Sequence, residues 1–169
     1  MFDLRLRLRR LVSALGALWC SRRDDDRPVP GSQAKLYLTD PVLAWLPSRL
    51  RAGLPLPDMT RLTEMALGVT LARAIDDLEE GRWLSGDTIA YSRTLTGNEV
   101  DLAPVSLPTW SGASPSVPLE CKWVDRGWRS EAKTVAGKYG RGILATKSVL
   151  DTDAEVWAVP APLIALLML

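Results

Sequence analysis

Residues 60–80, TRLTEMALGVTLARAIDDLEE, carry the clearest helical pattern of the chain. Apolar side chains recur there at the three- and four-residue spacing of one helix face, namely Leu67, Leu71, Ala74, Ile75 and Leu78. Charged side chains fall between them and face the other way. The pattern predicts an amphipathic helix that packs its apolar stripe against a core.

Two further helices are predicted from their start and stop signals. Asp40 followed by Pro41 is typical of an N-cap and a first helical residue, so we expect a helix from there to about residue 51. Residues 129–139 form the second, with Ser130 as the expected N-cap and glycines after Tyr139 that end it.

The two ends of the chain have weaker patterns. Residues 4–20 fit an N-terminal helix, and the charged, Pro- and Gly-containing stretch 21–33 has no periodicity and is expected to be a linker. The apolar tail 161–169 is too short for a membrane span and is expected to be a final core helix or strand. We therefore divide the chain into an N-terminal segment, 1–32, and one folded domain, 33–169.

Short segments of strand character surround the main helix, at residues 35–38, 88–93, 98–105, 117–123, 143–146 and 155–159. From the main helix onward the predicted order is one helix, three strands, a helix and two strands, with a strand and a helix in front. This order predicts an α/β (α+β) fold, in which a mixed sheet is flanked by helices.

Two consecutive predicted strands carry charged residues on one face. In VPLECKW, residues 117–123, alternation places Glu120 and Lys122 opposite the apolar side chains; in NEVDLAPV, residues 98–105, it does the same for Asp101. If the strands pair as a hairpin, these three side chains converge. The alternative is a solvated sheet face with weak cross-strand ion pairs.

Glu64 favours the convergence of these side chains over a solvated sheet face. Its helical position places this carboxylate within the apolar stripe of the helix over 60–80, where an unpaired charge is costly. A capping-box role is excluded because Arg61 stands three residues earlier. Glu64 is therefore expected to have a partner beneath the helix, either a metal ion or Lys122, unless the helix is rotated so that Glu64 lies at its rim.

The composition narrows the chemistry that is open to the chain. There is no histidine, which excludes Ser-His and Cys-His nucleophile pairs, and two distant cysteines are too few for a zinc site. Carboxylates such as Asp101 and Glu120 are the oxygen ligands that suit Mg²⁺, and Lys122 can orient or deprotonate a water or stabilise a phosphoryl transition state. The N-terminus lacks a signal-peptide cleavage pattern, so we expect a cytoplasmic protein without membrane association.

Glu64 in a helix, then NEVD, then PLECK resembles the PD-(D/E)XK nuclease fold. Several successive segments are also similar to the nuclease-like C-terminal domain of prokaryotic AAA-type ATPases, the domain of unknown function 4143: KLYLTDPVLAWL, TEMALGVTLARAI, IAYSRTLTGNEVDLAPV and PLECKW, within residues 33–160. The resemblance implies a restriction-endonuclease-like αβββαβ core with an extra N-terminal strand and helix. It also implies that Asp101 and Glu120 hold Mg²⁺, with Lys122 and Glu64 as further catalytic residues.

The resemblance carries expectations about partners as well. The related domain follows an ATPase module, but this sequence has no phosphate-binding loop, so no ATPase activity is expected and residues 1–32 are interpreted as a remnant of a preceding module. The predicted function is Mg²⁺-dependent hydrolysis of DNA. The alternative is a non-catalytic module of a truncated ATPase that binds DNA, the ATPase module or another protein.

Basic residues follow the E-x-K motif. Arg126, Arg129 and Lys133 are the candidates for contacts with DNA phosphates, although solvated lysines and arginines on an exposed helix are the common alternative. Trp128 lies among them and is expected either to stack on a base or to belong to the core.

Overall fold

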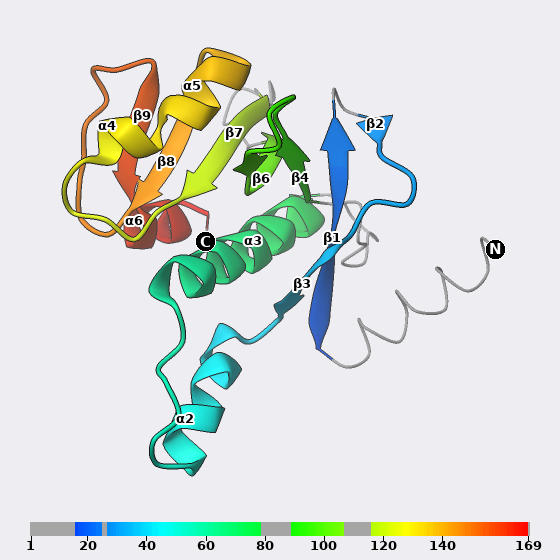
Figure 1. Cartoon of the computed structure of the whole chain (residues 1–169), viewed down its shortest axis with the longest axis vertical. Coiled ribbons are helices and arrows are strands. Elements are labelled where there is room, and N and C mark those ends of the chain that lie inside the picture. The colour runs from blue at the N-terminus through cyan, green and yellow to red at the C-terminus, as the bar shows by residue number, and fades with distance from the viewer. Residues whose placement is uncertain (1–15, 25–26, 79–88, 107–115, 169) are drawn as a thin grey trace.

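The computed structural model describes residues 16–24, 27–78, 89–106 and 116–168, which form two sheets with helices packed against them (Figure 1). The first sheet has five strands: β1 (Ala17–Asp24), β2 (Arg27–Pro28), β3 (Lys35–Leu38), β4 (Ala90–Arg93) and β5 (Glu99–Val100). β1 lies at its centre, because it pairs antiparallel with β2 and β3 and parallel with β4. β5 pairs antiparallel with β4 at the edge.

The second sheet has four strands in the order β6 (Leu102–Ser106), β7 (Ser116–Cys121), β8 (Gly142–Thr146) and β9 (Val156–Pro160). β6 and β7 form the predicted antiparallel pair, with Leu102 opposite Leu119. β7, β8 and β9 run parallel to one another. The mixed α/β architecture expected from the order of the elements is therefore confirmed.

The helices are η1 (Pro41–Trp45), α2 (Leu46–Leu50), α3 (Met59–Leu78), α4 (Trp128–Glu131), α5 (Lys133–Tyr139) and α6 (Ala161–Leu166). The predicted long helix is α3, and its stripe is confirmed because Leu67, Leu71 and Ala74 are buried. Asp40 caps η1 through the backbone N–H of Val42, as predicted. The tail forms a helix, α6, that packs into the core rather than a strand.

The faces of the second sheet pack against different helices. Leu119, Cys121 and Ala145 belong to a core cluster that also contains apolar residues of α3 and α6. Leu144 and Ala158 lie in a second cluster, with apolar residues of α4 and α5. Since side chains alternate along β7, Glu120 lies on the opposite face from Leu119 and Cys121. Both faces of the sheet thus carry packed helices.

Several expectations for the chain order are wrong. Residues 17–20 belong to strand β1, with Leu18 and Cys20 buried, and not to a helix; residues 4–15 lie outside the described part. The stretch 21–33 is not a structureless linker, because β1 continues to Asp24 and β2 follows. The strand expected over 98–105 is interrupted at Asp101, which lies between β5 and β6.

The helix expected over 129–139 also begins differently. It is divided into α4 and α5, and the residue before α4 is Gly127, with a left-handed backbone at φ 69°. Ser130 lies inside α4 and donates its hydroxyl to the carbonyl oxygen of Gly127, so its expected role as N-cap is wrong. The predicted C-terminal glycine is confirmed, since Gly140 caps α5 in a left-handed conformation that favours this residue.

Candidate functional site

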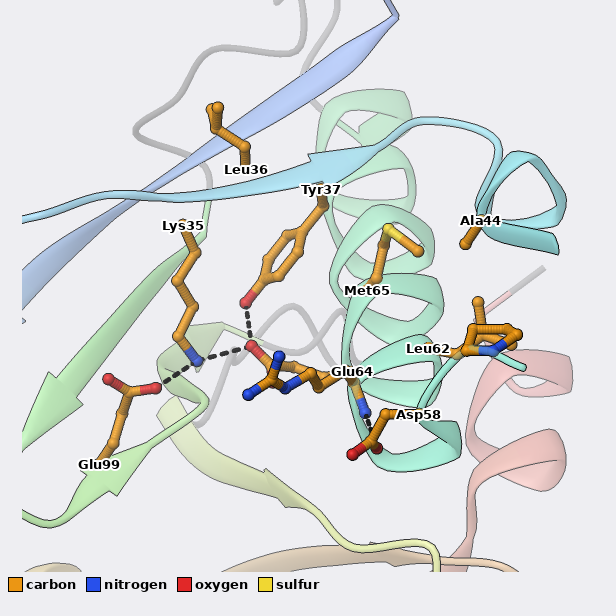
Figure 2. A pocket seen from close by; sticks show the side chains of 11 residues that line it. Lys35, Leu36, Tyr37, Ala44, Asp58, Leu62, Glu64, Met65 and Glu99 are labelled. Carbon is orange, nitrogen blue, oxygen red and sulfur yellow. Dashed lines mark hydrogen bonds and ion pairs between the residues drawn. The ribbon is translucent and has the colours of Figure 1, made fainter. Parts of the chain in front are cut away.

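Glu64 on α3 has partners beneath the helix, on strand β3 (Figure 2). Its Oε1 atom accepts a hydrogen bond from the hydroxyl of Tyr37 and one from the ammonium of Lys35, each at 2.6 Å. The side chain is 12% exposed. The expectation of a buried, partnered carboxylate is therefore confirmed, but the residue that pairs with Glu64 is Lys35 and not Lys122.

Lys35 gathers three carboxylates from different parts of the chain. Besides Glu64, its Nζ atom lies 2.6 Å from Oε1 of Glu99 on β5 and 3.0 Å from Oδ1 of Asp101. Figure 2 shows Lys35 extended between Glu64 and Glu99. Since oxygens that contact one nitrogen are necessarily neighbours, Glu64 and Asp101 lie at one point in space, as the sequence predicts.

Asp101 and Glu120 are linked through the hairpin of β6 and β7. The backbone N–H of Asp101 donates to Oε2 of Glu120 at 3.2 Å, and the backbone N–H of Cys121 donates to Oδ2 of Asp101 at 3.0 Å. These reciprocal bonds follow from the break in the strand at Asp101, which leaves its N–H free to turn toward β7. The two carboxylates that the sequence assigns to metal binding are therefore adjacent.

Lys122 completes the group. Its Nζ atom lies 2.9 Å from Oε1 of Glu120, just beyond the end of β7. The interpretation of this sheet face as solvated is wrong, because Glu120 is only 4% exposed and Asp101 only 7%. We use the name carboxylate cluster for Glu64, Glu99, Asp101 and Glu120 together with the ammonium groups of Lys35 and Lys122.

Burial and repulsion perturb the ionisation of the cluster. Desolvation, followed by the charge of Asp101, raises the pKa of Glu120 from 4.5 to about 7. The same two causes raise the pKa of Glu64, and Lys35 partly offsets them. Desolvation opposes the ammonium of Lys35, but Asp101 and Glu64 outweigh it and raise the pKa of this lysine. The raised pKa values of Glu64 and Glu120 reflect an enclosed site in which carboxylates repel one another.

Two hollows open onto the cluster. One has a volume of about 470 Å³ and is lined by Lys35, Tyr37 and Glu64, among apolar and basic side chains of η1 and α3. The other has a volume of about 330 Å³ and is lined by polar side chains: Asn98, Glu99, Asp101, Glu120, Lys122, Ser130, Glu131 and Thr134. Glu99 borders both, so the cluster forms the wall between them. A ligand in the second hollow can reach Asp101, Glu120 and Lys122 from one side.

The donor set can be compared with what Mg²⁺ requires. Within the described ranges, no group of three or more acidic, cysteine or histidine side chains is already arranged to hold a metal ion. Asp101 and Glu120 nevertheless offer the oxygen ligands that Mg²⁺ prefers. With its four carboxylates ionised, the cluster carries more negative charge than the ammonium groups of Lys35 and Lys122 and the guanidinium of Arg93, which pairs with Glu99 at 3.2 Å, can balance, and this favours a cation. The residues therefore fit Mg²⁺ in ligand type and charge, provided that Lys122 releases Glu120.

A basic groove lies next to the polar hollow. It has a volume of about 780 Å³ and shares Asn98 and Thr134 with that hollow. Four cationic side chains line it, Arg22, Arg93, Lys133 and Lys138, against the single carboxylate of Asp24. Lys133 is exposed, and no ion pair is formed by it among the described residues.

The three residues expected to contact DNA do not lie together. Lys133 lines the basic groove, Arg129 pairs with Asp151 at 2.6 Å near a different hollow, and Arg126 is exposed on the loop before α4. Their binding role stays a prediction. Trp128 is 6% exposed and belongs to the second core cluster, so its core interpretation is the correct one.

Sequence reasoning missed Lys35, Tyr37 and Glu99 as members of the site. Alternation in KLYL already places Lys35 and Tyr37 on one face of their strand, and the same logic identified Glu120 and Lys122. The sequence does not say which face turns inward. In the structure Leu36 is 55% exposed, so the polar side chains of β3, and not this leucine, face α3.

Comparisons with known protein families, with curated proteins and with solved structures find no match for this chain. The resemblance to the PD-(D/E)XK nuclease-like domain of AAA-type ATPases therefore stays a prediction that rests on the quoted motifs. Across the described residues, no helix combines the length and the apolar character that crossing a membrane requires.

Proposed function

We propose that this chain is a nuclease-like domain that hydrolyses phosphodiester bonds of DNA with the help of Mg²⁺. The observation that carries the proposal is the convergence of Glu64, Asp101, Glu120 and Lys122. These residues come from α3, from the break between β5 and β6, and from the end of β7, yet each is joined to the next through Lys35, a backbone hydrogen bond or a direct ion pair. Perturbed, buried carboxylates beside a polar hollow are typical of functional sites.

The order of elements supports the same proposal. From α3 the chain continues through β4, the interrupted strand β5 and β6, β7, the helix pair α4 and α5, and then β8, which lies parallel to β7. If β5 and β6, which belong to different sheets, are counted as one interrupted strand, this succession is compatible with the order αβββαβ that the PD-(D/E)XK resemblance implies. Asp101 lies at the break between β5 and β6, Glu120 lies on β7 and Lys122 follows the end of β7, while Glu64 lies on α3.

Each residue has a role that its surroundings allow. Asp101 and Glu120 would hold the metal ion, which supplies positive charge to the phosphate and makes a bound water more acidic. Lys122 is 32% exposed at the mouth of the polar hollow, so its ammonium can contact a phosphate oxygen or the attacking water. Glu64 and Tyr37 fix the position of Lys35, which in turn orients Asp101.

DNA is the proposed substrate because of the basic groove. Its cations adjoin the polar hollow, so a phosphate backbone bound along Arg22, Arg93 and Lys133 would lead toward Asp101 and Glu120. Contacts of this kind are independent of base sequence and weaken with salt. The groove includes only one of the three cations that the sequence suggested, Lys133.

A second candidate function is a non-catalytic module that binds DNA, an ATPase module or another protein. One observation favours it: every carboxylate of the cluster already has an ammonium partner, either Lys35 or Lys122. A cluster that is paired in this way can serve to hold α3, β3 and β7 together without any metal.

Incubation with supercoiled plasmid and with branched DNA, with Mg²⁺ and with EDTA, distinguishes the two. The nuclease proposal expects Mg²⁺-dependent cleavage that is lost in Lys122→Ala and Asp101→Ala, while gel-shift binding remains. DNA binding without cleavage by the wild-type chain would favour the binding module instead.

A further inference from the structure

The two lysines of the carboxylate cluster are held very differently. Lys35 contacts three carboxylates at 2.6 to 3.0 Å, whereas Lys122 contacts one carboxylate among the described residues, that of Glu120, at 2.9 Å. The side chain of Lys35 is 19% exposed and that of Lys122 is 32% exposed. Lys122 can therefore give up its single partner to solvent or to a phosphate, while Lys35 would have to leave three.

Lys35 is also fixed by its strand. It lies opposite Cys20 in the antiparallel pairing of β3 with β1, and the neighbouring Tyr37 binds the same oxygen of Glu64. Its ammonium also lies 5.3 Å from the centroid of the Tyr91 ring, a cation–π distance. Lys35 is thus surrounded on several sides by groups that favour a positive charge.

The arrangement around Lys35 is that of a bound cation. Carboxylate oxygens from α3, from β5 and from Asp101 converge on one positive centre, as they would on a metal ion, although at hydrogen-bond distances. Asp101 lies between this centre and Glu120, and its two oxygens are divided between the ammonium and the backbone N–H of Cys121. Each carboxylate oxygen has two lone pairs, so Oδ2 can contact a second cation besides this N–H, while Oδ1 keeps its contact with Lys35.

We propose that the ammonium of Lys35 permanently occupies one of two cation positions in the carboxylate cluster, and so limits the site to a single divalent ion at Asp101 and Glu120. The inference rests on the proposed metal site and deepens it. Two-metal hydrolases hold both ions between shared carboxylates. Here Lys35 supplies the second positive charge, so the site holds one metal ion.

The stoichiometry of Mn²⁺ binding tests this inference without requiring activity. Mn²⁺ takes oxygen ligands like those of Mg²⁺ and is counted by electron paramagnetic resonance or by isothermal titration. The wild-type chain is expected to bind one Mn²⁺. Lys35→Met keeps the length and the apolar stem but removes the charge, and is expected to bind two. Lys147→Met, which removes a lysine from an exposed ion pair with Asp125, is the matched control and is expected to bind one.

A wild-type chain that binds one ion and a Lys35→Met chain that also binds one would overturn the inference and leave the proposed function standing. A wild-type chain that binds two would overturn it as well. A wild-type chain that binds none would overturn both, because the site at Asp101 and Glu120 would be absent.

Lys35→Met removes the balancing charge from three carboxylates, so a second measurement uses the wild-type chain alone. An amine-reactive reagent, followed by peptide mass spectrometry, reports whether Lys35 is accessible with and without saturating Mn²⁺. If Lys35 keeps its place beside the ion, its modification stays low in both conditions, while that of Lys122 rises on metal binding. A rise of several-fold at Lys35 would show that the ion displaces it, which contradicts the inference.

Discussion

Ion pairs of similar length occur in two regions of the molecule with different surroundings. In the carboxylate cluster, Lys35 lies 2.6 Å from Glu64, and their side chains are 19% and 12% exposed. Between the loop after β7 and the end of β8, the pair of Lys147 and Asp125 is 2.8 Å long, with side chains 48% and 45% exposed. The chemical groups are the same, but only the first pair is removed from water.

The difference shows what burial does to charge. The cluster lies in a low-dielectric region, so each carboxylate depends on its ammonium and the pKa of Glu120 rises to about 7. At the surface, hydrogen bonds from Lys147 and Ser148 lower the pKa of Asp125, and solvent can replace either partner. The distance between two charged groups does not by itself identify a functional ion pair. The burial of their side chains has to be considered as well.

Removal of the buried ammonium is expected to have the largest effect on stability. Lys35→Met leaves Glu64, Glu99 and Asp101 without their shared cation, and breaking such a buried pair typically costs about 3–5 kcal/mol. Urea unfolding followed by circular dichroism measures the loss at neutral pH. A loss no greater than that of an exposed lysine would show that the cluster is effectively solvated.

The pH dependence of stability should come next in size. The folded pKa of Glu120 is raised above 4.5, so the folded chain binds this proton more tightly and its contribution to stability is full below pH 4.5. That contribution, on the order of 3 kcal/mol, is lost as the pH rises to about 7. Glu120→Gln cannot titrate, and the difference between its unfolding curve and that of the wild type should follow this window. An unchanged difference from pH 4.5 to 7.5 would contradict the shift.

A smaller effect is expected in DNA binding. Lys133→Ala removes one cation of the basic groove and should reduce the slope of log affinity against log salt by about one, without changing sequence preference. Fluorescence anisotropy with a labelled oligonucleotide between 50 and 200 mM salt measures the slope, with Lys147→Ala as control. Equal slopes for the wild type and Lys133→Ala would place the DNA elsewhere.

The smallest effect is expected at the exposed pair. Lys147→Ala removes the ammonium beside Asp125, where water and Ser148 remain to solvate the carboxylate. We expect the urea midpoint to stay within experimental error of the wild type. A clear loss of stability would mean that this surface pair is coupled to the fold, and the contrast between the two regions would then fail.

Much of the site could be predicted because it depends on local periodicity. The helical spacing around Glu64 and the alternation of strands 98–105 and 117–123 were sufficient to predict a buried carboxylate and a hairpin that joins Asp101 to Glu120. Both features follow from the spacing of apolar and polar residues within a single helix or strand. The mixed α/β class followed from the order of the same segments.

Other features depend on tertiary contacts that periodicity does not contain. The sequence fits a helix over residues 4–20, whereas Leu18 and Cys20 are buried at the two-residue spacing of a strand. Lys35 was missed because either face of β3 could have turned inward. Packing against α3 determines which face does so. The basic groove joins Arg22 to Lys133, which are far apart in sequence, so a linear run of lysines and arginines could not reveal it.

The central claim is that Asp101, Glu120 and Lys122 form one hydrolytic site, and plasmid nicking as a function of Mg²⁺ concentration tests it most directly. The account predicts nicking that requires Mg²⁺, is reduced at least about 100-fold in Asp101→Asn, as expected when a transition-state-stabilising group is lost, and persists in Asp125→Asn, the matched exposed carboxylate. A wild-type chain that does not nick DNA at any Mg²⁺ concentration, or an Asp101→Asn chain that nicks it equally well, would contradict the account.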